Sequence, residues 1–198
     1  RGIVELLEDH FHEMSPEERT RFLGFISDDT ERLDRLVRRL LELARADTCH
    51  PGDDVTYLGD TLARLADRFG KHGVHVHTQR ESASLTVRMS RETFESIISN
   101  LIDNSRQHGG ESVRVIIAAR EVEESGLKLV CIDFRDNGPG IPEVNRDKVF
   151  RPFFTTARDR GGSGLGLSIV RSLVTAHEGS ISLESSDSGA FFRILLPV

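Results

Sequence analysis

The sequence predicts an α+β chain in two parts, a pair of helices followed by a two-layer α/β sandwich. Residues 15–46 carry apolar side chains at spacings of three and four, which is the period of an amphipathic helix. Residues 48–54 include Pro51 and Gly52 and break that period, so we expect a linker there. Beyond the linker, short apolar runs alternate with further helical patterns, which indicates a sheet with helices on one face.

The composition indicates a chain with a core and a well-solvated surface, because 37% of its 198 residues are hydrophobic and 29% are charged. The net charge of −6 and the lack of a dense Lys/Arg block argue against nucleic-acid binding. Cys131 lies in an apolar run far from Cys49, so we expect a small core residue rather than a disulfide partner. No run approaches the ~18 apolar residues of a membrane span, and no signal peptide is visible. We therefore expect a cytoplasmic location, with any membrane segment in another part of a longer protein.

The first part of the chain resembles a helical hairpin whose first helix is incomplete. Residues 1–14 carry the apolar stripe of a helix end, and Ser15, Pro16 and Glu18 form the start of a second helix with a capping box. The stripe of this second helix, which runs to about Ala46, is too long for the first helix to cover. We expect a homodimer through residues 1–46 that completes a four-helix bundle; the alternative is a monomeric hairpin packed on the second part. The predicted domains are 1–47 (dimerisation helices), 48–54 (linker) and 55–198 (sandwich).

The second part alternates between helices and strands. His75 and His77 share one face of a predicted strand, and without a third ligand nearby a solvated face explains them better than a metal site. The final two strands form a hairpin, and we expect the helices to cover one face of an antiparallel sheet. The predicted helices cover residues 56–72, 90–108 and 165–176, and the predicted strands cover 74–77, 84–88, 112–120, 127–134, 180–184 and 190–196.

A candidate ligand site lies where the strand over residues 127–134 ends. Asp136 follows the apolar run at the point where backbone pairing stops, and Gly138 and Gly140 remove side chains that would block a ligand. Ile141 and the apolar wall around it could cover a flat ring. Taken alone, the same residues would also suit a polar turn with two glycines.

A second candidate feature is a polar stripe on the helix that Ser90 opens. Asn100, Asn104 and His108 are spaced by four and therefore lie on one stripe, beside the apolar face. Asparagine is unfavourable inside a helix because its side chain competes with the backbone for hydrogen bonds. Two asparagines one turn apart therefore indicate a site, although an exposed polar edge would also place them there.

A third candidate feature is the glycine-rich stretch that follows a long polar segment, residues 143–162. Gly162, Gly164 and Gly166 would let backbone N–H groups approach phosphates, and the helix from Leu165 presents its N-terminus to anions. The alternative is that these glycines serve as a loop hinge. A structureless segment of this length is usually functional or mobile.

Taken in order, the segments 100–104, 136–142, 150–154 and 161–167 resemble the asparagine box, the first glycine box, the phenylalanine box and the second glycine box of sensor histidine kinases. Those kinases share their ATP-binding fold with gyrase, heat-shock chaperone and mismatch-repair ATPases. The resemblance implies a sandwich of that type, with ATP and Mg²⁺ as cofactors. It also implies that Phe150, Phe153 and Phe154 anchor a lid to the domain.

The resemblance implies roles for individual residues. Asp136 would accept a hydrogen bond from the adenine amino group, Asn104 would bind Mg²⁺, and Asn100 would act in the shell of the metal. Asn100 and Asn104 are thus the expected catalytic residues. Hydrolytic relatives carry a glutamate in place of Asn100 as general base; an asparagine cannot take that proton, which favours phosphoryl transfer to a side chain. The full set of expected ATP contacts is Asn100, Asn104, Gln107, His108, Asp136, Gly138, Gly140, Ile141, Phe150, Phe154, Thr155, Thr156, Gly162, Ser163, Gly164, Leu165, Gly166 and Leu167.

Two positions depart from the family pattern. Family members often carry Lys or Arg where this chain has Gln107, and often a Lys where it has Ala157. Both cations would neutralise phosphate charge, and Arg106, Arg158 and Arg160 are adjacent candidates to replace them. The departures motivate an alternative function, an ATP-binding regulatory module with lost or weak kinase activity.

The leading hypothesis is the core of a dimeric histidine kinase that passes the phosphoryl group to an aspartate of a response-regulator receiver domain. An anti-sigma-type serine kinase shares the ATP fold, but the helices in residues 1–46 argue against it. The resemblance implies that the phosphoacceptor histidine lies before Arg1, with none in this chain. His12-Glu13, followed by Ser15-Pro16, is one residue shorter than the acceptor pattern.

Overall fold

The computed structural model of the chain describes residues 15–48, 54–79, 84–110, 113–158 and 161–198. The chain divides into two compact units, residues 1–40 and 41–198. The helix predicted in residues 1–14, the motif around His12 and most of the predicted linker lie outside the described residues. The domain boundaries therefore remain a prediction.

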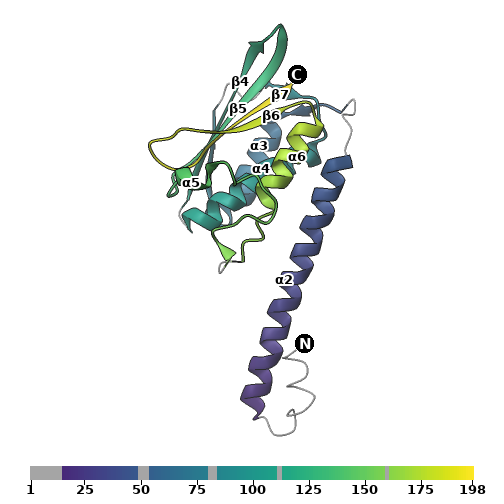
Figure 1. Ribbon diagram of the computed structural model, residues 1–198. Helices are drawn as coiled ribbons and strands as arrows, with labels where there is room; N and C mark the ends of the chain where they lie inside the picture. Colours follow the sequence, from purple (N-terminus) through teal and green to yellow (C-terminus); the bar gives the residue numbers. More distant parts are fainter. Residues whose placement is uncertain (1–14, 49–53, 80–83, 111–112, 159–160) are drawn as a thin grey trace. The chain divides into compact units, whose positions relative to one another are not determined.

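The long helix α2 (Pro16–Thr48) begins where the sequence predicts and ends two residues later than expected (Figure 1). Its capping box forms in full, since the backbone N–H of Glu18 donates to Ser15 Oγ at 3.2 Å and that of Ser15 to Glu18 Oε2 at 2.8 Å. The backbone hydrogen bond from Ser15 lowers the pKa of Glu18. Among the described helices, none combines the length and apolar character that a bilayer span requires.

The second unit is built on a five-stranded sheet in the order β2-β4-β5-β7-β6. Neighbouring strands are antiparallel except β2 and β4, which are parallel. The prediction of a wholly antiparallel sheet is therefore wrong for this pair. The reason lies in the connection, since a helix crosses over between β2 and β4, as parallel neighbours require. The strands are β2 (His75–Thr78), β4 (Arg114–Glu124), β5 (Leu127–Asp136), β6 (Ser180–Glu184) and β7 (Phe191–Pro197).

Two very short strands, β1 (Thr56–Tyr57) and β3 (Thr86–Val87), form a separate antiparallel sheet. Strand β1 was not predicted, and the helix expected from residue 56 begins at Leu58 instead. The reason is that the Thr56 side chain is buried, with its hydroxyl donating to Met89 O at 2.7 Å. Strands of two residues are too short to show a period in the sequence.

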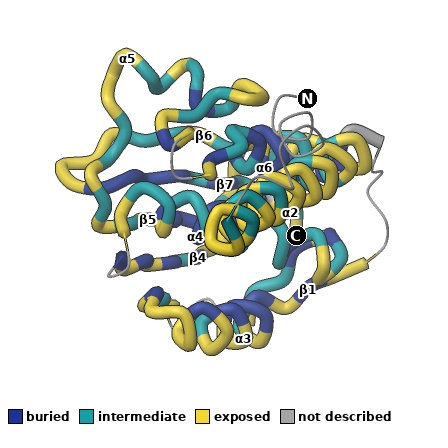
Figure 2. Tube along the Cα trace, turned by 90° about the horizontal axis from the view of Figure 1, so that it is seen from below, coloured by how far each residue is buried: buried dark blue, intermediate teal, exposed yellow. Residues whose placement is uncertain are grey.

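Three helices, α3 (Leu58–Gly70), α4 (Arg91–Gly109) and α6 (Gly166–Ala176), cover one face of the sheet (Figures 1 and 2). As predicted, Ser90 caps α4 by accepting a hydrogen bond from the Thr93 backbone N–H at 3.2 Å. Alternate strand residues point toward the helices, so the two-layer sandwich is confirmed. Fully buried core residues include Leu62, Leu65, Phe94, Ile97, Ile98, Leu101, Val130, Ile132, Phe134, Ile169, Phe192 and Ile194.

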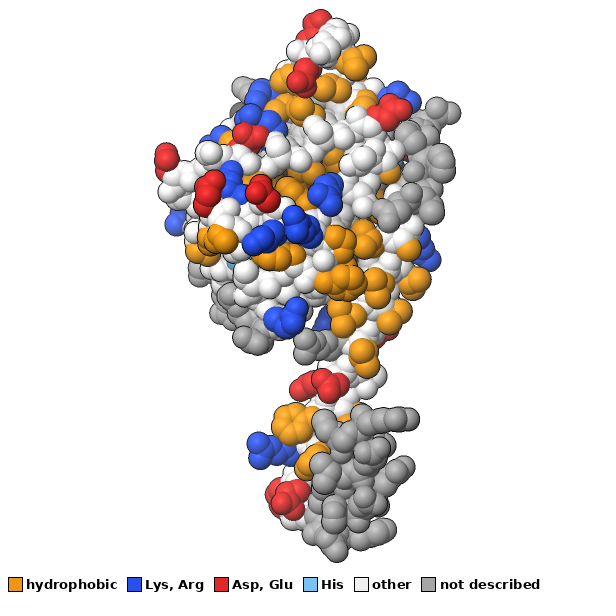
Figure 3. All heavy atoms as spheres, in the orientation of Figure 1, with side chains coloured by type: hydrophobic (Ala, Val, Ile, Leu, Met, Phe, Trp, Pro, Cys, Tyr) orange, Lys and Arg blue, Asp and Glu red, His pale blue; other side chains and the backbone are white. Residues whose placement is uncertain are grey.

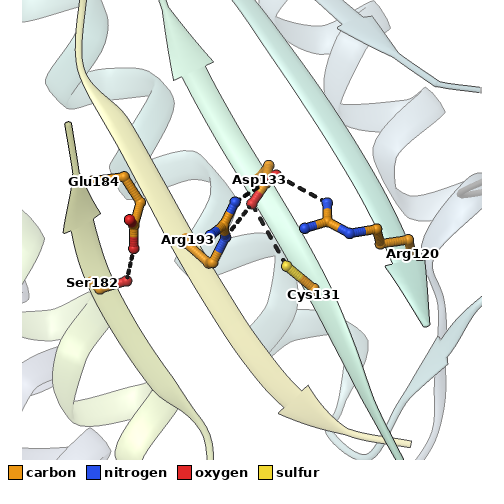
Figure 4. Close-up of polar contacts among 6 residues, drawn as sticks. All are labelled: Arg120, Cys131, Asp133, Ser182, Glu184 and Arg193. Atoms are coloured by element: carbon orange, nitrogen blue, oxygen red, sulfur yellow. Dashed lines mark hydrogen bonds and ion pairs between the residues drawn. The ribbon is translucent and has the colours of Figure 1, made fainter. Parts of the chain in front are cut away.

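The opposite face of the sheet is covered by its own polar side chains (Figure 4). The carboxylate of Asp133 on β5 accepts from Arg193 Nε at 2.8 Å and from Arg120 Nη1 at 3.0 Å. Cys131 lies two residues earlier and is buried, as predicted, and this burial raises the pKa of its thiol. The guanidinium of Arg193 also lies 5.2 Å from the ring centroid of Phe191.

The β4–β5 hairpin is longer than predicted, because its turn comprises only Ser125 and Gly126. Both residues have positive φ, 54° and 80°, as a two-residue hairpin turn requires. The extension makes Asp136 the last residue of β5, paired with Val115 of β4. The side chain that the sequence placed just beyond the strand is therefore held by the sheet itself.

Candidate functional site

The carboxylate of Asp136 is held by three donors that carry no charge. Its Oδ1 accepts from the backbone N–H groups of Gly138 and Ala190, each at 2.9 Å. Its Oδ2 accepts from the hydroxyl of Ser105 on α4, at 2.6 Å. Within the described part of the chain, Asp136 forms no ion pair. The carboxylate is thus fixed in orientation, and no cation among the described residues neutralises its charge. Its side chain is half-exposed.

Two glycine turns pack backbone against backbone beside Asp136. A Cβ on Gly189, where φ is 69°, would lie 1.7 Å from the carbonyl oxygen of Asp136. A Cβ on Gly140, where φ is 75°, would lie 3.1 Å from the carbonyl oxygen of Gly189. The sequence predicts that Gly138 and Gly140 leave room for a ligand. The structure shows that their turn also packs against the backbone of Gly189, which leaves no room for a side chain on Gly140.

Sequence reasoning missed three residues of this site, namely Ser105, Gly189 and Ala190. Gly189 lies in the β6–β7 hairpin loop, where a glycine is expected for the turn alone. Ser105 directly follows the polar position Asn104, but nothing in the sequence shows that its hydroxyl meets β5.

Helix α4 carries the predicted polar stripe. Asn100 is 8% exposed, and its side-chain N–H donates to the carbonyl oxygen of Ser96 at 3.0 Å. Because that carbonyl can only accept, the amide nitrogen of Asn100 must face it, which leaves Oδ1 as an acceptor on the other side. Asn104 and His108 are half-buried. An exposed polar edge does not describe this stripe, since its first member is buried.

The side-chain oxygens of the asparagine stripe could hold a hard divalent ion only if a bound ligand supplied further oxygen atoms. Asparagine oxygens are acceptable ligands for Mg²⁺, which prefers oxygen and retains several waters. Among the described residues, no group of three His, Cys, Asp or Glu side chains is placed to hold a metal. His75 and His77 have exposed side chains on β2. An ion at Asn104 would therefore take most of its ligands from phosphate oxygens and water.

The phenylalanine segment divides into two half-buried rings and one exposed ring. Phe150 is half-buried and meets Phe192 edge to face, with ring centroids 6.2 Å apart. Phe154 is also half-buried against the core. Phe153 is 56% exposed and has a φ of 65°, so the prediction that all three rings anchor the lid is wrong for this residue. Its ring is therefore open to solvent rather than packed in the core.

The glycine-rich loop folds back on the phenylalanine segment. A Cβ on Gly164, where φ is 68°, would lie 2.5 Å from the carbonyl carbon of Phe153. The backbone N–H of Gly162 donates to Ala157 O at 2.9 Å, and the N–H of Ala157 donates to Thr155 Oγ1 at 3.0 Å. Thr156 is exposed. Close packing therefore explains Gly162 and Gly164, whereas their phosphate and hinge roles stay predictions.

The start of α6 presents backbone rather than side chains. Leu165 is fully buried and Leu167 is 8% exposed, and both side chains belong to the core. The Leu165 N–H donates to Ser163 Oγ at 3.3 Å, and Gly166 opens the helix. Any contact between these leucines and a ligand would therefore come from the backbone, at a helix end that favours anions.

Helix α4 connects the separate segments. Ser105 bonds to Asp136, and a Cβ on Gly162 would lie 3.0 Å from Gln107 Nε2. The structure therefore brings the asparagine stripe, the Asp136 turn and the glycine loop together around one helix. Ile141 is half-buried against the core beside the Asp136 turn.

Two of the three candidate replacement cations, Arg106 and Arg158, lie at the surface. Arg106 is exposed and lies 3.5 Å from Asp103 Oδ1. Arg158 is exposed next to the buried Ala157, and Arg160 lies outside the described residues. The half-buried Gln107 on α4 faces the glycine loop.

Comparison with known proteins decides the family. Residues 89–198 match the model of the histidine kinase-, DNA gyrase B- and HSP90-like ATPases. The chain belongs to this family. Within it, the relatives are sensor kinases, as the order of the motifs predicted. The chain is 35% identical over 176 residues to the signal transduction histidine-protein kinase AfsQ2 of Streptomyces coelicolor, an alignment that covers 85% of this chain and 31% of that protein.

A second relative in the ATPase family is the probable sensor histidine kinase HK of Mycobacterium tuberculosis, 34% identical over 175 residues, with 86% of this chain and 45% of that protein covered. The chain thus spans less than half the length of both relatives. Among solved structures, the catalytic domain of histidine kinase ThkA is 26% identical with a TM-score of 0.62, covering 73% of this chain and 94% of that one. ThkA in complex with the response regulator TrrA is 22% identical with a TM-score of 0.71, covers 98% of this chain and 56% of that one, and shows the fold alone.

Proposed function

We propose that this chain is the ATP-binding core of a sensor histidine kinase. It would transfer the γ-phosphoryl group of ATP to a histidine, from which the group passes to an aspartate on a response regulator. The observation that carries the proposal is the Asp136 carboxylate, which is fixed by three neutral donors beside the helix that bears Asn100 and Asn104. The kinship with sensor histidine kinases supports the choice of reaction.

Asp136 is proposed to select adenine. An ionised carboxylate only accepts hydrogen bonds, so it prefers a base that presents an amino group. Adenine has such a group at the position where guanine has a carbonyl oxygen. Ile141 would cover one face of the ring, since it lies half-buried beside the Asp136 turn.

The phosphates are proposed to lie between α4 and the glycine loop. Asn104 would bind Mg²⁺ directly and Asn100 would bind it or a water in its shell, each through a side-chain oxygen. The glycine loop, residues 162–167, would meet the phosphates through backbone N–H groups other than those of Gly162 and Leu165, which already donate to Ala157 O and Ser163 Oγ. Mg²⁺, when bound, neutralises phosphate charge. Because asparagine cannot act as general base for water, the site favours phosphoryl transfer over hydrolysis.

A second candidate, an ATP-binding module with weak kinase activity, is favoured by Ala157. This residue is 2% exposed, and its carbonyl oxygen already accepts from Gly162. No cation projects into the site from this position. Gln107 likewise brings an amide rather than a charge.

The exposed face of α2 supports the proposed homodimer. Leu23, Phe25, Leu33 and Val37 are 46–62% exposed, and apolar side chains are visible on the surface of this helix (Figure 3). A second copy of the helix pair would cover them in a four-helix bundle. We propose such a homodimer on the cytoplasmic side of the membrane, with a receiver domain as the second protein partner.

Two measurements test the proposal. Calorimetry on this chain should show binding of ATP that strengthens with Mg²⁺ and exceeds binding of GTP. The full-length protein incubated with labelled ATP should acquire acid-labile phosphate and pass it to a receiver domain. Binding without labelling would favour the weak module, and equal affinity for ATP and GTP would contradict the role of Asp136.

A further inference from the structure

A chain of hydrogen bonds leads from the last turns of α2 to Asn100. The hydroxyl of Ser96 on α4 bonds to Glu42 Oε1 of α2. One helical turn further along α4, Asn100 Nδ2 lies 3.0 Å from Ser96 O and 3.4 Å from Ser96 Oγ. Glu42 belongs to the second compact unit, which begins at Leu41, so all three residues lie in one body.

The direction of every hydrogen bond in this chain is determined by chemistry. The Glu42 carboxylate can only accept, so the Ser96 hydroxyl donates to it. That hydroxyl can then only accept from Asn100, whose amide nitrogen faces it. The amide nitrogen of Asn100 is therefore directed at Ser96, and Oδ1 remains as the acceptor available to a ligand.

The end of α2 that carries Glu42 is packed on the sandwich. Ala46, one turn later, is 1% exposed and belongs to the core, and Leu43 packs against that core. Glu42 and Ser96 are themselves half-buried, so water competes for their hydrogen bond less than at an exposed pair. The position of this turn of α2 thus determines whether Ser96 has its acceptor.

We propose that Glu42 and Ser96 are positioning residues that hold the Asn100 side chain with its oxygen toward the metal and phosphates, and that they couple this orientation to the docking of α2. The proposal rests on the proposed function of the Asn100 site. A shift of the α2 end removes the acceptor of Ser96, frees its hydroxyl to donate elsewhere, and leaves Asn100 with one fixed donor. The expected consequence is weaker binding of the metal–nucleotide complex, with adenine recognition at Asp136 unchanged.

The test compares ADP binding to this chain with and without Mg²⁺, by calorimetry. Ser96→Ala should reduce the gain in affinity that Mg²⁺ provides by about tenfold, the lower end for residues that orient metal ligands, because Asn100 keeps its bond to Ser96 O. The affinity for ADP in EDTA should not change. Ser96→Thr retains a hydroxyl and should restore the gain.

Glu42→Ala should act in the same direction as Ser96→Ala. The double variant should lose no more of the Mg²⁺ gain than Ser96→Ala alone, since the two substitutions remove the same hydrogen bond. The matched control is Ser99→Ala on the same helix, whose hydroxyl accepts from Arg68 Nη2 at 2.5 Å away from this chain of bonds. It should leave the Mg²⁺ gain unchanged.

Several results would overturn the inference. These are an unchanged Mg²⁺ gain in Ser96→Ala, an equal loss of affinity in EDTA, or an equal loss in Ser99→Ala. If the parent chain binds ADP and Ser96→Ala binds it identically, this inference fails while the proposed function stands. If the parent chain binds ADP under neither condition, the proposed function fails and this inference with it.

Discussion

Two carboxylates on one strand have opposite surroundings. Asp133 and Asp136 lie three residues apart on β5. Asp133, on the open face of the sheet, bonds to two guanidinium groups, those of Arg120 and Arg193. Asp136, at the end of the strand, bonds to one hydroxyl and two backbone N–H groups.

The difference shows how a structural carboxylate can be told from one that binds a ligand. The two cations neutralise Asp133 and occupy its oxygens, so it has little to offer a further ligand. The neutral donors around Asp136 fix its orientation but leave its charge, which stays available to a hydrogen-bond donor. This contrast, rather than burial, makes Asp136 the candidate site.

The largest expected effect comes from the backbone that holds Asp136. Gly189→Ala should lower the free energy of unfolding by about 3 kcal/mol or more, because its Cβ would collide with Asp136 O and its φ is positive. Gly126→Ala is the matched control, with a φ of 80° and open space around the Cβ, and should cost about 1–2 kcal/mol. Urea denaturation measures both; equal costs would show that the two turns do not pack as described.

Removing the charge of Asp133 should have a smaller effect on stability. Asp133→Asn leaves Arg120 and Arg193 without their anion, and a fully buried pair broken in this way costs about 3–5 kcal/mol. The two arginine side chains are 48% and 33% exposed, so we expect about 2 kcal/mol. Asp103→Asn, which breaks an exposed pair with Arg106 on α4, should cost less than about 0.5 kcal/mol in the same urea titration.

The pH dependence of that cost is a finer test. Burial works to raise the pKa of Asp133, but the hydrogen bonds and charges of Arg193 and Arg120 outweigh it, and the pKa lies below its usual value. The stabilisation is therefore complete above the unfolded pKa of about 3.9 and is lost as the pH falls through the lower folded value. The difference in unfolding free energy between the parent chain and Asp133→Asn should shrink below about pH 4. A difference that stays constant down to pH 3 would contradict this assignment.

The parts of the site that could be predicted are those with a local signature. Asp136 is predictable because a strand ends there just before two glycines. Asn100 and Asn104 are predictable because asparagine is unfavourable inside a helix. The capping box at Ser15 also has a local signature, namely Ser15 followed three residues later by Glu18. Each of these signals lies within a few residues of its subject.

What could not be predicted depends on contacts between distant segments. Ser105 and Ala190 reach Asp136 across 31 and 54 residues of sequence. The exposure of Phe153 and its positive φ have no signal in the sequence. The parallel pairing of β2 with β4 likewise follows from a crossover, which a strand pattern does not reveal.

The central claim, that Asp136 binds the base through the charge its neutral donors preserve, is tested most directly by a pair of isosteric substitutions on β5. In Asp136→Asn, the N–H groups of Gly138 and Ala190 require the amide oxygen at the Oδ1 position, so the NH₂ group must face the ligand. Two donors then oppose each other, and the affinity for ADP measured by calorimetry should fall about a hundredfold. Asp133→Asn should change that affinity by less than about twofold, since it lowers the free energy of unfolding without touching the proposed base site. An Asp136→Asn variant that is folded and binds ADP as tightly as Asp133→Asn would contradict the account.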